Sequence, residues 1–413
     1  MGGTTKGYPG SRDSLCAANI TFDEASAILA AHCDPLGQED VALAEAGGRV
    51  LAKDVLSRID SPRCDVAAMD GFAIRTADLS GQQSLPIVGA GFPGSLPAMH
   101  RPGTACRVTT GGTIPKGADR VIPWELATAQ DDHVRFDPDL PRKSHIRAKC
   151  SDLQSGATIL SSGQSLTSLA LVAVAGGDVD EVTVWRKPRI AMFATGDELV
   201  EPGKGRETLA RIPDSLSAAM RFMIVNWGGV VTSASRAMDR LGDIRSAAEA
   251  ALSDADVLVF TAGASHGERD LTIAAMQDLG LNLRFAGVRM KPGKPVWYGT
   301  IAGKQVLGLP GNPTAAMTVA RLFLAPLLVS LQGRQWTSAL DWEDRATLEP
   351  IPANGDREAF LCADEAKGTV RLLDRQSSSD QARLVLANAL VRIPPFAKTC
   401  PAGSSVQTLS FQP

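Results

Sequence analysis

The stretch from residue 189 to residue 330 constrains the fold most, because continuously apolar strands alternate there with amphipathic helices. Strands that are apolar at every position are buried on both faces, which is typical of a parallel sheet covered by helices on each side. We therefore expect a central parallel-type α/β sheet domain. The predicted strands are 190–194, 230–234, 257–261, 296–298 and 306–309, and the predicted helices begin at Asp214, Gly242, Asp270 and Pro313.

On either side of this domain, the pattern of apolar residues along the chain is different. Short apolar runs separated by Gly and Pro predict a β-rich domain at 55–155 and a small β-barrel near the C-terminus. A capping-box pattern at 21–24 predicts a helix there, and a second helix is expected at 36–46. The expected partition is a flexible tail at 1–19, one domain built from 20–54 and 156–186, and domains at 55–155, 187–331 and 332–413.

Composition excludes several classes of protein. The net charge of −3 over 413 residues leaves no global field that would attract nucleic acid or an anionic membrane. The most apolar stretch, at 315–331, is interrupted by Arg321 and Pro326, and the first twenty residues lack an apolar core, so no membrane segment is expected. Seven cysteines without a C-x-x-C pair favour a reducing compartment, and we expect a cytoplasmic protein.

Three loops follow predicted strands of the α/β domain, at 194–199, 261–270 and 307–313. In open α/β sheets, ligands bind beyond the carboxyl ends of the strands, where helix N-termini present free backbone N–H groups. If the strands are parallel, the loops meet at one edge and form a site suited to an anion or a phosphate. The alternative is that their Gly and Asn residues only make turns, and that Asp214 and Asp270 only cap helices.

A cationic loop at 289–295 places Arg289, Lys291 and Lys294 beside two prolines. A stiffened loop of this kind is suited to clamp an oxyanion, because Lys supplies a point charge and Arg a fork of donors. The alternative is an exposed turn with solvated side chains.

The β-rich domain carries two further candidates. Asp70 stands in a segment of small and apolar residues, where a buried carboxylate would need a partner or a task. The Thr/Gly-rich turn at 108–119 resembles a backbone cradle, although its order is not that of a P-loop. The five histidines show no metal-ligand spacing.

Together these motifs resemble the MoeA family of molybdopterin molybdenumtransferases, which includes the E domain of gephyrin. The motifs that carry the resemblance occur in the family's order at 68–73, 110–119, 195–199, 291–295 and 309–313. The resemblance covers the chain from about residue 20 to its C-terminus. It implies an α/β multidomain fold in which the α/β domain binds molybdopterin.

The implied activity is the last step of molybdenum cofactor synthesis, in which adenylated molybdopterin and molybdate give the cofactor and AMP with the help of Mg²⁺. The resemblance assigns catalysis to Asp70, Glu198 and Asp270, with Glu198 and Asp270 also holding the metal. It assigns substrate binding to Thr110, Asp152, Asp214, Ser265, Arg289, Lys291, Lys294, Pro310, Pro313 and Ser378.

The resemblance also implies a homodimer. In the family, residues equivalent to 20–54 and 156–186 form an elongated dimerisation domain, and the active cleft lies between the α/β domain of one subunit and the β-rich domain of the other. Asp70 and Glu198 then meet only across an interface. The resemblance also allows partners of three kinds: a molybdopterin adenylyltransferase, molybdoenzymes and the chaperones of molybdoenzymes.

The chain departs from the family's pattern at four positions. Leu216 replaces a common Asn, Ala262 a Gly, Cys150 a Gly, and Cys362 stands where an Arg is expected. Loss of an arginine fork would weaken the binding of an oxyanion. Two alternatives to the enzyme are therefore a non-catalytic paralogue that carries molybdopterin or scaffolds partners, and a generic nucleotide-binding α/β protein.

Overall fold

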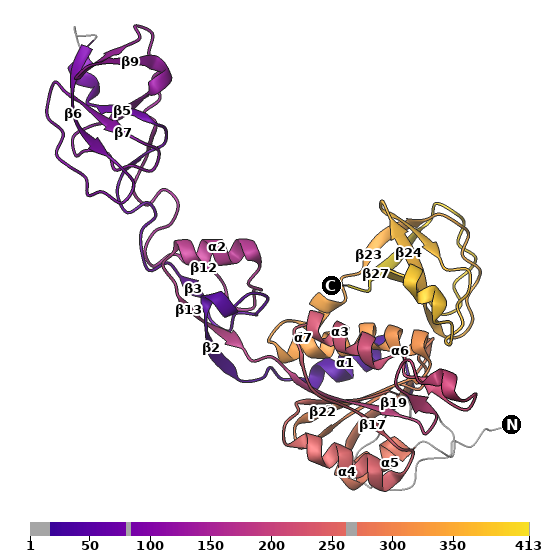
Figure 1. The fold of residues 1–413 in the computed structure, drawn as a ribbon. Helices are drawn as coiled ribbons and strands as arrows, with labels where there is room; N and C mark the ends of the chain where they lie inside the picture. Colours follow the sequence, from indigo (N-terminus) through magenta and orange to yellow (C-terminus); the bar gives the residue numbers. More distant parts are fainter. Residues whose placement is uncertain (1–16, 80–83, 262–270, 413) are drawn as a thin grey trace. The chain divides into compact units, whose positions relative to one another are not determined.

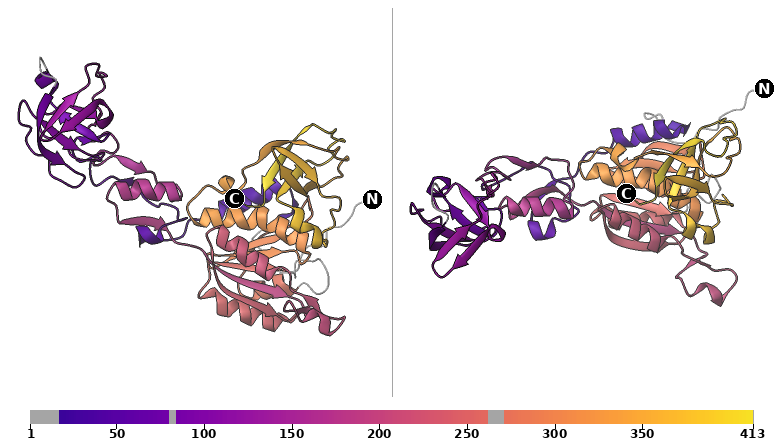
Figure 2. Two further views of the ribbon diagram at one scale, coloured as in Figure 1. Left: turned by 45° about the horizontal axis from the view of Figure 1, so that its top comes forward. Right: turned by 90° about the horizontal axis from the view of Figure 1, so that it is seen from above.

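The computed structural model describes residues 17–79, 84–261 and 271–412. The chain forms two compact units. The large unit comprises Met1–Glu39 and Trp185–Pro413, and the inserted unit comprises Asp40–Val184. Figures 1 and 2 draw the chain with its sequence in colour from indigo to yellow.

A seven-stranded sheet forms the centre of the large unit, and the α/β prediction for this stretch is confirmed. In spatial order the strands are β1 (Ala17–Ile20), β19 (Asn282–Val288), β21 (Trp297–Ile301), β22 (Lys304–Leu309), β18 (Val257–Thr261), β14 (Arg189–Thr195) and β17 (Val230–Ala237). Of the five predicted strands, β14, β17, β18 and β22 are parallel, and β21 runs antiparallel to both neighbours; β1 and β19 are parallel to each other and were not among the predicted strands. The direction of β21 is due to a two-residue hairpin in which Ala302 and Gly303 both have positive φ, of 48° and 81°.

Helices cover both faces of this sheet (Figure 1). One face carries α1 (Phe22–Ala31), α3 (Ser217–Asn226), α6 (Pro313–Val319) and α7 (Ala325–Leu331), and the other carries α4 (Leu241–Leu252) and α5 (Leu271–Asp278). The pleat of β14 explains the division, because Ile190 and Met192 join the first core while Ala191 and Phe193 join the second.

The long apolar helix lies inside the large unit. A π-helical turn at Ala320–Leu324 joins α6 to α7, so the helix is continuous over Pro313–Leu331. By length and composition it is the one helix among the described residues that is able to cross a membrane, but 94% of its apolar window is buried, as in a core helix. Figure 2 shows the indigo helix α1 beside it, and the backbone N–H of Leu36 donates to the carbonyl of Leu331 at 2.9 Å.

The C-terminal segment forms the predicted β-barrel. Its strands are β23 (Glu343–Thr347), β24 (Glu358–Ala366), β25 (Thr369–Leu372), β26 (Ala389–Ile393) and β27 (Ser405–Ser410). Pairing of β24 with β26 closes the ring of five strands. A short strand from the cationic loop, β20 (Met290–Lys291), adds to the edge of β24, and this pairing fixes the loop's backbone to the barrel.

The inserted unit contains the predicted β-rich sheet. In spatial order its six strands are β8 (Arg120–Pro123), β5 (Gly71–Ile74), β7 (Ala105–Val108), β6 (Ser84–Gly91), β10 (His133–Phe136) and β9 (Ala127–Gln130). A separate core surrounds α2 (Ser168–Gly176) and includes Leu51, Val174 and Val184. Three short strand pairs complete the unit: β2 (Gln38–Ala42) with β13 (Glu181–Trp185), β3 (Val55–Leu56) with β12 (Thr158–Leu160), and β4 (Val66–Ala67) with β11 (Ile146–Arg147).

The N-terminal predictions have mixed outcomes. The capping box is confirmed, because the hydroxyl of Thr21 accepts the Glu24 N–H at 3.2 Å and the Glu24 carboxylate accepts the Thr21 N–H at 2.8 Å. The helix predicted at 36–46 is wrong, because this segment forms β2 and a 3₁₀ turn at Leu43–Glu45. The predicted tail at 1–19 is wrong for its last three residues, which belong to β1; residues 1–16 lie outside the described range.

Candidate active site

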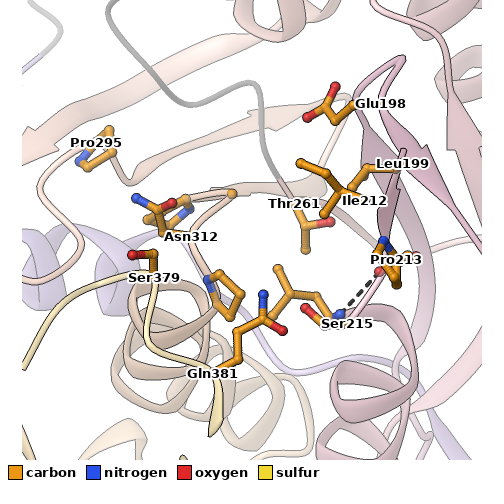
Figure 3. Close-up of a pocket in the computed structure, with 15 residues that line it drawn as sticks. Glu198, Leu199, Ile212, Pro213, Ser215, Thr261, Pro295, Asn312, Ser379 and Gln381 are labelled. Carbon is orange, nitrogen blue, oxygen red and sulfur yellow. Dashed lines mark hydrogen bonds between the residues drawn. The ribbon is translucent and has the colours of Figure 1, made fainter. Parts of the chain in front are cut away.

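A cavity of about 540 Å³ opens beyond the carboxyl ends of β14, β18 and β22. This is the edge of the sheet at which the strand-end loops were predicted to meet. Four of the predicted site residues line the cavity, namely Glu198, Asp214, Pro310 and Pro313. Figure 3 shows the labelled lining side chains around it, with Glu198 at one end and Asn312, Ser379 and Gln381 at the other.

Glu198 reaches the cavity through a backbone conformation that favours glycine. Gly196 follows β14 with φ of +144°, and a Cβ atom at this position would lie 2.9 Å from both carboxylate oxygens of Glu198. The glycine therefore leaves the space in which the carboxylate sits. The backbone of Glu198 is anchored as well, because its carbonyl accepts the N–H of Ile212 at 2.9 Å. The side chain itself is exposed and available to a ligand.

Asp214 lines the cavity and also binds the turn that leads into α3. Its Oδ1 accepts the backbone N–H groups of Leu216 and Ser217, both at 3.1 Å, and its Oδ2 accepts the Ser217 hydroxyl at 2.5 Å. These bonds hold the turn that enters α3, but the N-cap residue of this helix is Leu216, so the interpretation of Asp214 as the N-cap is wrong. Leu216 lines the cavity and is buried in the first core.

The loop before α6 holds a turn of the C-terminal segment. Asn312 stands at the N-cap, but its side chain makes no capping bond and instead donates to Ser378 Oγ at 3.2 Å. The carbonyl of Ser378 accepts the N–H of Thr314 at 3.1 Å. Asn312 is therefore the N-cap residue and Pro313 the first helical residue, which confirms the predicted helix start, although the N-cap side chain bonds Ser378 instead of the helix. The Ser378 backbone takes one of the N–H groups that the helix start would offer a ligand. Ser378 lies next to the cavity, whose lining includes Ser379.

The cationic loop lies beside the cavity rather than in its wall. Pro295 is the lining residue, while Lys291 and Lys294 are exposed and form no ion pair with any described residue. Arg289 lies near the start of α1, where its charge helps the hydrogen bonds from Thr21 to lower the pKa of Glu24. No Lys, Arg or His is found among the described lining residues, so the cavity wall carries only the two carboxylates as charges.

Asp70, Thr110 and Asp152 belong to the inserted unit. Asp70 Oδ1 accepts both the backbone N–H of Thr110, at 2.6 Å, and its hydroxyl, at 2.8 Å. These two bonds hold the pKa of Asp70 below its ordinary value. The expectation that Asp70 is buried is wrong, because its side chain is exposed in the turn between β4 and β5. Asp152 is also exposed, and its N–H donates to the Ser61 carbonyl at 2.9 Å.

Two predicted residues, Ser265 and Asp270, lie outside the described residues, as does Ala262. Within the described ranges, no group of three or more His, Cys, Asp or Glu side chains is placed to hold a metal ion. The other oxygen atoms that the described lining offers a ligand belong to residues such as Thr261, Ser215 and Asn312. Cys362 is not among the described residues that line the cavity; its thiol is buried, and burial raises its pKa to about 11.

Five polar residues of the described lining are absent from the predicted site residues, namely Ser215, Thr261, Asn312, Ser379 and Gln381. Thr261 ends β18 and is buried, with its hydroxyl donating to the Phe193 carbonyl at 3.4 Å. Its place at a strand end was the signal that would have found it. Ser379 belongs to the serine-rich turn already noted at Ser378, whereas Gln381 has no distinguishing pattern around it.

Comparison with known proteins agrees with this arrangement. The family model described as "MoeA N-terminal region (domain I and II)" matches residues 20–176, and the one described as "Probable molybdopterin binding domain" matches residues 191–330. The molybdopterin molybdenumtransferase of Haemophilus influenzae is 30% identical over 400 residues, covering 95% of this chain and 98% of that protein. The namesake from Synechococcus elongatus is 33% identical over 306 residues, covering 72% and 76%.

Solved structures agree as well. The crystal structure of the molybdopterin biosynthesis MoeA protein from Pyrococcus horikoshii matches with a TM-score of 0.80 and 25% identity, covering 96% of this chain and all of that one. The fold, the sequence matches and the strand-end cavity all lead to the same conclusion: the chain belongs to the MoeA family of molybdopterin molybdenumtransferases.

Proposed function

We propose that this protein is a molybdopterin molybdenumtransferase, which inserts molybdate into adenylated molybdopterin and releases AMP. The observation that carries the proposal is the whole-length match to a relative of that name, combined with the cavity at the strand ends that Glu198, Asp214, Pro310 and Pro313 line. This is the position at which α/β sheets bind nucleotide-like ligands.

The donor set around Glu198 fits Mg²⁺. The described lining offers carboxylate, hydroxyl and amide oxygens without a thiol or an imidazole, and Mg²⁺ prefers oxygen ligands shared with substrate phosphates. We propose that Glu198 and Asp270 hold the metal, which when bound would neutralise phosphate charge and polarise the bond to be cleaved. Glu198 is exposed beside Gly196 and is free to turn toward such an ion.

The remaining roles follow from the chemistry of the side chains. Lys291 and Lys294 are unpaired cations next to the cavity, and we propose that they attract molybdate, which is a dianion, together with Arg289 and Ser265. Asp214 keeps α3 in place beneath the ligand. Pro310 and Pro313, with Ser378, keep the opposite wall rigid.

The inserted unit supplies Asp70, Thr110 and Asp152. We propose that these residues act within a homodimer, in which residues 20–54 and 156–186 form the dimerisation domain, and that Asp70 serves the cleft formed with a second copy. The Asp70 carboxylate is exposed and ionised, since its pKa is lowered, and its Oδ2 accepts no hydrogen bond from a described residue. It is therefore able to accept a bond from substrate.

The first experiment measures AMP release by a Glu198→Gln variant with molybdate and Mg²⁺. We expect a loss of at least about 100-fold in turnover, since a misplaced or missing catalytic group costs that order. Glu201→Gln is the matched control, because Glu201 is an exposed carboxylate three residues on that pairs with Arg236 at 2.9 Å and does not line the cavity. Equal activity of the two variants would contradict the role of Glu198.

A second experiment tests the assignment of Asp70 to another copy. We expect Glu198→Gln and Asp70→Asn each to be inactive alone, whereas a mixed dimer of the two would have one cleft with both carboxylates intact. Mixing the variants under conditions of subunit exchange is therefore expected to restore a fraction of wild-type turnover. Mixtures as inactive as their components, with exchange demonstrated, would contradict the shared cleft.

One observation favours a second candidate function. Leu216 places an apolar side chain in the cavity wall where the family commonly has Asn, and this removes a polar contact. A paralogue that carries molybdopterin without converting it would bind the adenylated pterin tightly and release no AMP. Partnership with an adenylyltransferase or with molybdoenzymes would serve either function.

A further inference from the structure

A second cavity, of about 530 Å³, lies in the large unit between the long helix and the C-terminal barrel. Its wall includes Arg321 and Val329 from the helix and Thr408 and Ser410 from β27. It shares no described lining residue with the cavity at the strand ends. Its volume falls within the range of roughly 300–1,000 Å³ that is typical of small-molecule sites.

Arg321 brings a buried positive charge to the wall of this cavity. The residue is only 3% exposed. Its Nε donates to the Ser410 carbonyl at 2.5 Å, and its Nη1 donates to the Ala339 carbonyl at 2.6 Å. A guanidinium has five N–H groups, so three of them have no acceptor among the residues that the structure describes. The two carbonyls hold the guanidinium in place but do not neutralise its charge.

Within the described ranges, no carboxylate pairs with Arg321. Two carboxylates of the lining, Glu343 and Glu365, pair with Arg345 instead, and Arg345 Nε lies 2.6 Å from Glu365 Oε1. The third, Asp341, belongs to an exposed residue. Burial lowers the pKa of Arg321 to about 10, so the guanidinium keeps its charge at neutral pH. Because a buried charge without a partner is costly, an anion that enters from solution would stabilise this arrangement.

The backbone around Arg321 gives an independent observation. Arg321 lies in the π-helical turn Ala320–Leu324, in which the N–H of Ala325 donates to the Ala320 carbonyl, five residues back. Single π-helical turns are rare within α-helices and are frequently found at functional sites. The turn therefore supports a role for Arg321 besides packing.

A second arginine lines the same cavity. Arg334 is partly buried and forms no ion pair with any residue of the described part of the chain. The lining therefore carries two guanidinium groups, those of Arg321 and Arg334, whose charges no described carboxylate neutralises by a direct pair. The N–H fork of a guanidinium matches the oxygen atoms of a carboxylate or a phosphate group.

We propose that this cavity binds a small organic molecule through a carboxylate or phosphate group. The unused N–H groups of Arg321 donate to the oxygen atoms of that group, and the charge of Arg334 adds attraction. Arg321 already links the long helix to β27 and to the 3₁₀ turn Trp336–Ala339. The bound anion therefore stabilises the contact between the barrel and the α/β domain, at a site separate from the one assigned to molybdate and the pterin.

The test titrates the whole protein with sodium acetate and with sodium phosphate, at constant ionic strength, by isothermal titration calorimetry. We expect saturable binding of at least one of these probes, and the tighter of the two identifies the chemical class of the natural group. Arg321→Gln should lose this binding. Arg334→Gln should weaken it by at least about threefold, the order expected of an attraction between partly exposed charges.

Two control variants show whether the binding belongs to this cavity. Arg371→Gln is the matched control, because Arg371 is a barrel arginine that pairs with Glu349 at 3.1 Å and does not line the cavity. It should bind the probes as the wild type does. A double variant with Lys291→Ala and Lys294→Ala lacks two cations proposed to attract molybdate, and it should also keep the binding. The result is therefore independent of the proposed function.

Arg334→Gln also guards against loss of fold, because the Arg334 side chain donates no hydrogen bond to a described residue, whereas Arg321→Gln removes two. Its melting profile without a probe should match that of the wild type. At ten times its dissociation constant, the bound probe should shift the wild-type unfolding equilibrium about 11-fold toward the folded state. The absence of saturable binding to the wild type, or equal affinities of the wild type, Arg321→Gln and Arg334→Gln, would overturn the proposal.

Discussion

The position of the Glu198 carboxylate depends on Gly196, and replacing this glycine by alanine tests that dependence. The new Cβ atom would lie 2.9 Å from both carboxylate oxygens and 3.0 Å from Cδ of Glu198. These separations are too short, so the carboxylate must move. Because it is the far end of an exposed side chain, the move itself costs little stability.

The backbone contributes the larger part of the stability change. At φ of +144° an L-residue is strained, and residues in such conformations cost roughly 1–3 kcal/mol. A displacement of the carboxylate by about 1 Å is expected to lower turnover by about 100-fold. Gly196→Ala therefore combines a modest loss of stability with a large loss of activity.

Gly203→Ala is the matched control. Gly203 also has a positive φ, of +97°, but no heavy atom lies within 4 Å of its added Cβ. It should lose stability of the same order and keep most of its activity. Two quantities are measured for each variant: the rate of AMP release, and the free energy of unfolding from urea denaturation. If Gly196→Ala remains within threefold of Gly203→Ala in turnover, the reasoning about Glu198 is refuted.

Two further predictions concern carboxylates with defined partners. Asp256→Asn should lower the stability of the large unit by about 2 kcal/mol, less than the roughly 3–5 of a fully buried pair because the Arg186 side chain is 34% exposed. Urea unfolding followed by tryptophan fluorescence checks this in a Trp124→Phe background, since Trp124 is the one tryptophan outside that unit. Burial opposes ionisation of Asp256, but the Arg186 guanidinium outweighs this effect and lowers the pKa of the carboxyl. The stabilisation by this ion pair is therefore lost below about pH 4, where the carboxylate is protonated. The difference in free energy of unfolding between wild type and Asp256→Asn should become smaller there. Thr110→Ala should raise the pKa of Asp70 toward its ordinary value in an NMR titration, and an unchanged or lower pKa would contradict the role of the hydroxyl.

The sequence predicts those helices and strands whose formation depends on the local pattern of residues. The alternation of apolar strands and helices over 189–330 correctly indicates the α/β sheet, and the Thr21–Glu24 capping box correctly indicates the start of α1. The strand-end loops predict the edge where the cavity lies, because the carboxyl ends of parallel strands share one edge.

Local sequence patterns do not predict elements that form through contacts with distant parts of the chain. The short strand β1 has no apolar run of its own and forms because it pairs with β19, far along the chain. The segment 36–46 is helical by apolar spacing alone, but its β2 residues pair with β13 instead. Gln381 lines the cavity because the nearby turn at Ser378 contacts the start of α6. No local sequence pattern predicts that contact.

The central claim is that this chain inserts molybdate into adenylated molybdopterin. The most direct measurement is the amount of AMP released from adenylated molybdopterin by the wild-type protein with Mg²⁺, with and without molybdate. The account predicts AMP release that requires molybdate and equals the amount of cofactor formed. Tight binding of the adenylated pterin with no molybdate-dependent AMP would contradict it.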